Sequence, residues 1–202
     1  MTGDILVALV IFAVVSSITP GPNNMMLLAS GVNFGIRRTV PHALGVSIGF
    51  AAMLVAVGFG LNAAFEAVPG LYLVLRFLGA GYLLWLAWRI AHAGPPSAGG
   101  ASKGRPMSFL EASAFQWVNP KAWVMAVGAL SNYTPRDGYM VNVAIVAAVF
   151  AIVNLPCVSI WAGAGAAMRS VLEKPAVLRA FNWTMAAALV ATLYPIFAGS
   201  FG

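Results

Sequence analysis

Amide, lysine and proline residues are gathered in two short stretches of an otherwise apolar chain. The first is Thr19-Pro20-Gly21-Pro22-Asn23-Asn24, and the second is Asn119-Pro120-Lys121. Proline lacks a backbone N–H and disfavours the helical conformation of the preceding residue, so each stretch predicts a broken helix with free carbonyl groups. With one further amide in a later apolar segment, they provide the candidate substrate-binding residues, which are Pro20, Gly21, Pro22, Asn23, Asn24, Asn119, Pro120, Lys121 and Asn154.

Lys121 is the only ionisable residue near the centre of any apolar segment. A charge at membrane depth is costly, which makes it a functional hypothesis by default. Its partner could be a freed carbonyl in a purely structural role, a substrate carboxylate or a coupled proton. The asparagines could likewise contact substrate or only satisfy the broken backbone. His42, which lies near one end of its segment, is interpreted as an interfacial polar residue in preference to a proton relay.

The composition indicates an integral membrane protein. The chain is 61% hydrophobic and 8% charged, with a mean hydropathy of +0.89, values that do not fit a soluble domain. The net charge is +6, but the basic residues lie mainly in loops between apolar segments, so we expect no nucleic-acid partner. Asp4 precedes the first apolar run, with no Lys or Arg there and no small-residue cleavage site after it, so we expect this helix to be retained.

The apolar segments predict an all-α domain over residues 1–202 with six transmembrane helices. At 1.5 Å per residue the first run, residues 5–34, is about 45 Å long, more than the roughly 30 Å hydrocarbon core requires. The alternative for this run is a short helix, a surface loop and an interfacial helix, which would leave five spans. The expected spans are residues 5–34, 42–65, 71–91, 109–132, 139–163 and 176–198, with the first and fourth broken.

The two halves of the chain share this layout. Residues 1–92 and 108–202 each contain a broken helix followed by two further spans, and a linker rich in Gly, Pro and Ser joins them at residues 93–107. Because each half has three spans, the second must enter the membrane from the opposite side, as in the inverted repeats of secondary transporters. Such paired broken helices indicate a binding site at the repeat interface. Ser108 and Glu111 have capping-box spacing at the start of the second half.

Basic residues predict the orientation of the chain in the membrane. One side has only Arg136 in its loops and Arg76 just inside a span. The loops on the other side should be cytoplasmic and both termini external, because cytoplasmic loops carry an excess of Lys and Arg. The residues expected on the cytoplasmic side are Arg37, Arg38, Arg89, Lys103, Arg105, Arg169, Lys174 and Arg179.

These motifs closely resemble those of the LysE/RhtB family of bacterial amino-acid exporters. The resemblance rests on residues 19–23, on Gly31 and Gly35-Ile36-Arg37-Arg38, on Gly45 to Gly49 and on residues 119–122, and it spans nearly the whole chain. It implies an inner-membrane, multi-pass protein that carries amino acids or their derivatives outward. Phe115-Gln116-Trp117 and Ala129-Leu130-Ser131 look most like the branch of cysteine and O-acetylserine exporters. Ser131-Asn132 departs from the Pro-Gln found in many members, so the resemblance leaves the substrate open.

We therefore expect a secondary transporter for neutral amino acids or small derivatives, with the lipid bilayer as its surroundings and a homo-oligomer as a possible assembly. The alternative is a divalent-cation exporter, which would require Asp or Glu inside the membrane, whereas every acidic residue lies at or near a span end. No catalytic set or zinc-spaced cluster appears, so we expect no enzyme, cofactor or bound metal. With Cys157 as the single cysteine, a thiol-exchange conduit is nearly excluded.

Overall fold

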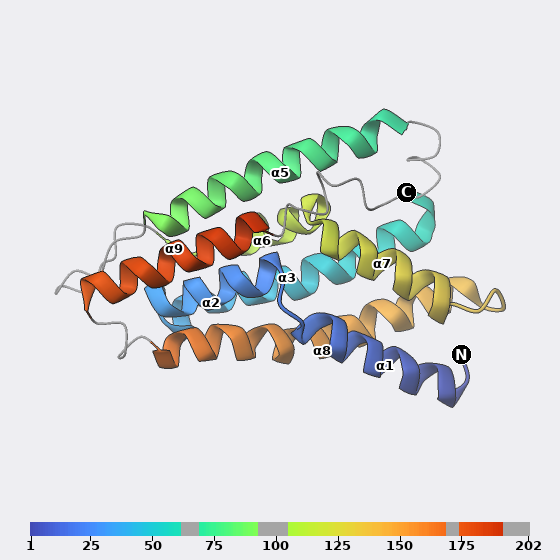
Figure 1. The fold of residues 1–202 in the computed structure, drawn as a ribbon. Coiled ribbons are helices and arrows are strands. Elements are labelled where there is room, and N and C mark those ends of the chain that lie inside the picture. The colour runs from blue at the N-terminus through green and yellow to red at the C-terminus, as the bar shows by residue number, and fades with distance from the viewer. Residues whose placement is uncertain (62–68, 93–104, 169–173, 192–202) are drawn as a thin grey trace.

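The computed structural model describes residues 1–61, 69–92, 105–168 and 174–191 (Figure 1). Over these ranges the chain is helical and contains no strand. The expected linker at 93–107 lies mostly outside the described residues, as do the ends of the second and sixth expected spans.

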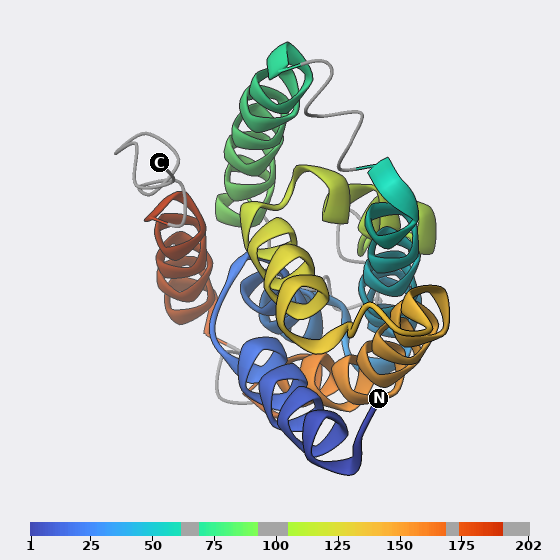
Figure 2. The same cartoon turned by 90° about the vertical axis from the view of Figure 1, so that its right-hand side faces the viewer.

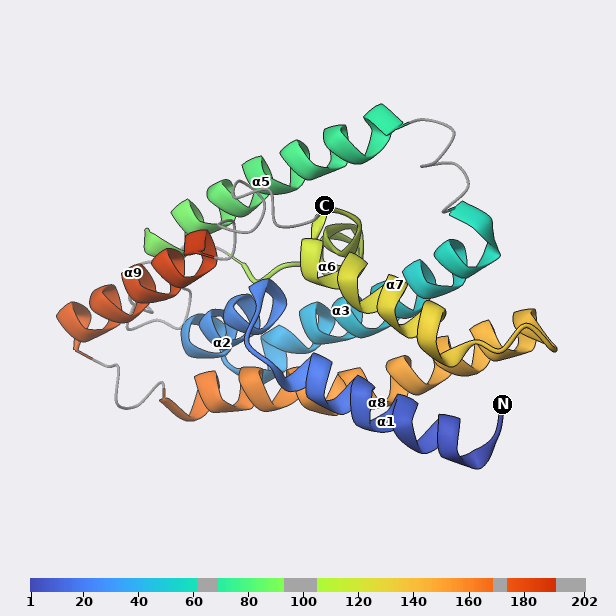
Figure 3. The same cartoon turned by 45° about the vertical axis from the view of Figure 1, so that its right-hand side comes forward.

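The first expected span is broken where the sequence predicts. Helix α1 covers Gly3–Ile18 and α2 covers Pro22–Phe34, and the two axes are bent by 55°. The bend follows from Pro20, Gly21 and Pro22, since Gly21 is fully extended and Pro22 occupies the first helical position, where no N–H is needed. The two halves lie one after the other along α8, which covers Tyr139–Met168 (Figure 3).

The second expected span begins earlier than the sequence suggested. Helix α3 covers Ile36–Ala56 and starts directly after Gly35, whose φ of 77° gives the sharp turn from α2. Pro41 therefore lies inside the helix and does not open it. It is tolerated because the carbonyl that loses its hydrogen bond belongs to the exposed Arg37, near the helix start. A short π-helix, η1, continues over Val57–Leu61.

The remaining helices follow the expected segments closely. Helix α5 covers Pro69–Ala91, and α9, which covers Pro175–Ala191, packs beside it on one side of the bundle (Figure 2). The fourth expected span is broken into α6 at Phe109–Phe115, the 3₁₀ turn η2 at Gln116–Val118 and α7 at Pro120–Tyr133. The predicted capping box is present, because Ser108 Oγ accepts from the Glu111 backbone N–H and Glu111 accepts from that of Ser108. Helix α8 continues five residues beyond its expected end at residue 163.

Within the described parts of the chain, two helices, residues 36–60 and Tyr139–Met168, are long and apolar enough to cross a membrane, and the bent pair α1 and α2 would make a third span. Large apolar side chains such as Val7, Phe77 and Ile152 are exposed on the outside of the bundle, as expected for a surface in contact with lipid. The described residues thus form an all-α membrane protein. The six spans and the inverted repeat remain predictions.

Glycine lets the backbones of two helix pairs come into direct contact. A Cβ atom added at Gly31 of α2 would lie 2.1 Å from the carbonyl oxygen of Ala162 in α8, and one at Gly165 of α8 would lie 2.1 Å from that of Leu28. On the other side of the bundle, a Cβ added at Gly49 of α3 would lie 2.5 Å from Ser113 Cα in α6. These contacts replace side-chain packing with backbone packing, as is common between membrane helices.

Among the described residues the apolar core has two large parts and a small cluster of Val32, Leu178 and Phe181. One lies among α2, α5, α6, α9 and parts of α3 and α8, and the other among α1, α7 and the remaining parts of α3 and α8. A layer of buried polar side chains lies where the two parts meet, and its members are Ser17, Asn24, Ser47, Gln116, Asn119 and Asn154. Because burying a polar group without a hydrogen-bond partner is costly, we expect the side chains of this layer to be bonded to one another or to the backbone.

Candidate functional site

The two helix breaks meet inside the bundle. A Cβ atom added at Gly21 would lie 2.7 Å from Lys121 Cδ, so the lysine stem runs directly over the backbone of the first break. Its Nζ donates a hydrogen bond to the Thr19 carbonyl at 2.5 Å. The sequence predicted a binding site shared by the paired broken helices, and the absence of a side chain at Gly21 makes their contact sterically possible.

The carbonyl groups at the end of α1 are satisfied by side chains from other parts of the chain. Asn24 Nδ2 donates to the carbonyls of Ser17 and Thr19 at 2.8 and 2.9 Å. Trp161 Nε1 in α8 donates to the Ile18 carbonyl at 3.1 Å. The first break is therefore held by specific donors, as backbone at membrane depth requires. Both amide hydrogens of Asn24 serve this purpose, which favours a structural role for that residue.

Asn154 connects three helices through its amide. Ser47 Oγ of α3 donates to Asn154 Oδ1 at 2.9 Å, and Asn154 Nδ2 donates to Ser17 Oγ of α1 at 3.1 Å. At the second break, Asn119 caps α7 by accepting from the Lys121 backbone N–H at 3.1 Å. Both amides are almost fully buried, so these bonds fix the positions of the elements around the breaks.

Asn23 and Gln116 join the two breaks directly. Asn23 Nδ2 donates to Gln116 Oε1 at 2.9 Å, and Gln116 Nε2 donates to Asn23 Oδ1 at 3.3 Å and to the Ala112 carbonyl at 2.8 Å. In contrast to Asn24, Asn23 bonds only to the Gln116 side chain among the residues that the structure describes. Its amide can therefore bond to a ligand in place of Gln116 without leaving a backbone group of α1 unsatisfied.

A small cavity of about 20 Å³ lies at this junction. Six of the nine predicted site residues line it, namely Gly21, Asn23, Asn24, Asn119, Lys121 and Asn154. The three prolines do not. Pro20 is exposed, and Pro22 and Pro120 begin α2 and α7, so their contribution is to shape the breaks.

The cavity lining combines one cation with several amides and hydroxyls. Among the residues that the structure describes, Lys121 is the only ionisable one in this lining, and none is a carboxylate. The described residues contain no group of three or more His, Cys, Asp and Glu side chains that could hold a metal ion. An anionic group is the natural partner for such a site, with amide donors and acceptors available to orient neighbouring polar atoms.

Sequence reasoning missed several residues that line or support the cavity. Ser16, Ser17 and Gln116 line it, and Ser47 and Trp161 hold its surroundings. Gln116 was recognisable as an amide one helical turn before the second break, and Ser47 as one of the few polar residues in its span. No local signal identifies Trp161, because its partner Ile18 is distant in the sequence.

Two broken helices that meet around a polar cavity in an apolar bundle define the class of helical membrane transporters. The chain matches the family model of LysE type translocators over residues 14–193. It belongs to the LysE type translocator family, as the resemblance in its motifs suggested.

Curated relatives cover almost the full chain. The cysteine/O-acetylserine efflux protein of Klebsiella pneumoniae subsp. pneumoniae is 32% identical over 197 residues, which are 94% of this chain and 95% of that protein. The proteins of the same name from Escherichia coli strain K12 and Salmonella typhimurium strain LT2 are 32% and 31% identical over 170 residues, covering 82% of this chain and 84% of each relative. No solved structure matches the chain.

Proposed function

We propose that this protein is a secondary transporter that exports neutral amino acids or small amino-acid derivatives across the bacterial inner membrane. The observation that carries the proposal is the position of Lys121 in a cavity where the two helix breaks meet, with no acidic residue among the described residues that line it. The names of the relatives, cysteine/O-acetylserine efflux proteins, support the same substrate class.

In this proposal the substrate carboxylate binds Lys121 or the first N–H groups of α2 or α7, both of which begin at the cavity. A helix N-terminus favours anions because its N–H groups point outward and its dipole is positive there. Asn23 and Gln116 orient the remaining polar groups of the substrate. A substrate with a cationic side chain, such as lysine, would find no acidic partner in the lining, so a neutral side chain fits better.

The described conformation is closed around the site. A volume of about 20 Å³ accommodates one or two waters, which is less than an amino acid needs. Binding therefore requires an opening motion, and we propose that six spans in two inverted repeats supply it by alternating access. With no carboxylate in the cavity, Lys121 or the substrate itself is the remaining candidate to carry a coupled proton.

The decisive variant is Lys121→Met, tested for export of O-acetyl-L-serine, cysteine and lysine from proteoliposomes. We expect export of the neutral substrates to fall about 30-fold or more, because losing one partner of a buried charge pair costs about 2–5 kcal/mol. Folding should be retained, because the Thr19 carbonyl keeps its bond from Asn24 when Lys121 is removed. Arg136→Met removes an exposed cation outside this cavity and should export normally.

Three results would contradict the proposal. Full export by a well-folded Lys121→Met variant would refute the site, and a loss of export in proportion to a loss of folded protein would assign the lysine a structural role. Robust export of lysine by the unaltered chain would refute the substrate class.

The proposed orientation places both termini outside and Lys103 in the cytoplasm, since the basic residues lie so unequally on the two sides. On a Cys157→Ser background, an impermeant thiol reagent applied to intact spheroplasts should label Asp137→Cys and leave Lys103→Cys unlabelled. The opposite pattern would invert the topology.

A further inference from the structure

A second and larger cavity lies between α2, α3, α5 and residues 105–107. Its volume is about 70 Å³, and its lining shares no residue with that of the cavity at Lys121. By volume it has room for several waters, so it is the roomier of the two sites for a small ligand. Its basic residues, Arg89 and Arg105, come from the side of the bundle expected to be cytoplasmic.

His42 is the unusual residue of this lining. The sequence suggested an interfacial position, but its side chain is only 1% exposed and lines the cavity. Neither ring nitrogen has a hydrogen-bond partner among the residues that the structure describes. Leaving a buried polar group unsatisfied costs about 1–3 kcal/mol, so a ligand that hydrogen-bonds to the His42 imidazole would remove this cost.

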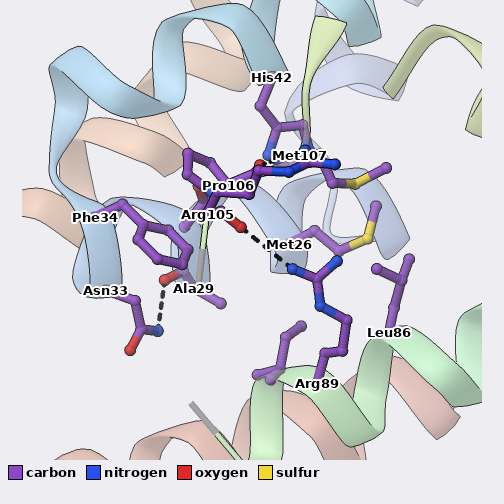
Figure 4. Close-up of a pocket in the computed structure, with 12 residues that line it drawn as sticks. Met26, Ala29, Asn33, Phe34, His42, Leu86, Arg89, Arg105, Pro106 and Met107 are labelled. Carbon is purple, nitrogen blue, oxygen red and sulfur yellow. Dashed lines mark hydrogen bonds between the residues drawn. The ribbon is translucent and has the colours of Figure 1, made fainter. Parts of the chain in front are cut away.

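The two arginines of the lining differ in their partners. Arg105 is paired with Glu111 through two contacts of 2.6 Å, so its charge is neutralised. Arg89 donates only to the Arg105 carbonyl at 3.3 Å and lies over the Trp85 ring at 4.8 Å, with no carboxylate partner in the described ranges. Figure 4 shows Arg89 and His42 entering the cavity from opposite sides. Arg89 is thus the cation available to a bound anion.

From this arrangement we infer that the cavity is a reception site for a zwitterionic α-amino acid on its way from the cytoplasm to Lys121. The substrate carboxylate binds the Arg89 guanidinium, which offers several donors in a planar fork. The substrate ammonium donates to the bare ring nitrogen of neutral His42, whose other nitrogen carries a donor. A simple inorganic anion would leave the acceptor nitrogen of His42 unsatisfied. This inference rests on the proposed function for the identity of the ligand.

The test is protection of a thiol placed in the cavity. Ala29 lines it and is replaced by cysteine in a chain that also carries Cys157→Ser and Lys121→Met, so that the central site is disabled. Methyl methanethiosulfonate is the labelling reagent and O-acetyl-L-serine is the probe. Bound probe slows labelling by the factor 1 + [L]/Kd, which is about tenfold at about nine times Kd. Ser131→Cys, which lines a different cavity, serves as the matched control and should not be protected.

Further variants test whether the protection depends on Arg89 and His42. Arg89→Gln should abolish the protection of Ala29→Cys and His42→Leu should weaken it, whereas Arg37→Gln, which removes an exposed cation outside the cavity, should preserve it. The methyl ester of the probe, which lacks a free carboxylate, should not protect. Equal labelling with and without O-acetyl-L-serine overturns the site, and protection that survives Arg89→Gln overturns its assignment.

Failure of this inference can be separated from failure of the proposed function. Export of O-acetyl-L-serine by the Cys157→Ser chain is measured in proteoliposomes prepared alongside. Export without protection at Ala29→Cys overturns only the reception site. Protection without export supports the site and overturns the exporter assignment.

Discussion

Replacing Asn24 with alanine tests whether this residue holds the first helix break together. The substitution removes the two hydrogen bonds that Asn24 donates to the end of α1, which are 2.8 Å long to the Ser17 carbonyl and 2.9 Å long to the Thr19 carbonyl. The Ser17 carbonyl is then left without this donor in a buried setting, at a cost of about 1–3 kcal/mol. The Thr19 carbonyl keeps its hydrogen bond from Lys121, so losing the bond from Asn24 lowers the stability of the fold by about 0.5–1.5 kcal/mol. We expect a total destabilisation of about 2–4 kcal/mol.

The measurement is the melting temperature of the purified protein in detergent, followed by size-exclusion chromatography after heating. A chain of this length loses about 2–4 °C per kcal/mol, so Asn24→Ala should melt roughly 5–15 °C below the unaltered chain. Asn23→Ala is the matched control, because Asn23 bonds only the Gln116 side chain, which retains its bond to the Ala112 carbonyl. Its melting temperature should fall less than that of Asn24→Ala, because Gln116 lines the cavity, where water can replace Asn23 as the donor to Gln116 Oε1.

Two outcomes would refute this reasoning. If both alanine variants melted at the same temperature, the carbonyls of the break would not depend on Asn24. If Asn24→Ala lost export while its melting temperature stayed unchanged, the amide would act on the substrate and not on the backbone.

Two further predictions concern glycine. Gly31→Ala should destabilise the protein by about 1–3 kcal/mol, because its Cβ would lie 2.1 Å from the Ala162 carbonyl oxygen. The control is Gly81→Ala, whose Cβ would have nothing within 4 Å, so this variant should melt at or above the temperature of the unaltered chain. Equal melting temperatures of the two variants would contradict the α2–α8 contact. Gly21→Ala should fold normally but export about tenfold more slowly, because the added methyl displaces the Lys121 stem. A loss of about 1.4 kcal/mol in substrate-binding free energy corresponds to a tenfold loss of affinity. Unchanged O-acetyl-L-serine export in proteoliposomes would show that the lysine moves aside freely.

The sequence predicted the features that depend on neighbouring residues. Both helix breaks and the capping box at Ser108 depend on residues that are close together in the sequence, because proline and capping residues act within one helical turn. Pro41 was misleading, since the same residue that ends helices elsewhere is accepted near the exposed start of α3. The same local reasoning identified Lys121 as a candidate, because its charge stands alone in an apolar span.

Partners across the fold could not be predicted from the sequence. Asn23 and Gln116 are 93 residues apart, and Trp161 reaches Ile18 over 143 residues. Nothing local marks such pairs, because any buried amide or indole can satisfy any carbonyl within reach. His42 was placed at an interface for a similar reason, since its neighbours in the cavity come from α2, α5 and residues 105–107, which are distant in the sequence or on other helices.

The backbone contacts between helices have a mechanical consequence for transport. Where Gly31 and Gly165 bring α2 against α8, sliding would drive carbonyl groups into backbone atoms, so this pair must travel as one rigid body. Gly49 joins α3 to α6 in the same way. By contrast, α3 and α8 meet through side chains such as Phe50 and Phe150, whose rings are 5.2 Å apart and can turn to new rotamers. The opening motion proposed above should therefore occur at the seam between these two bodies, where it must break the hydrogen bond between Ser47 and Asn154.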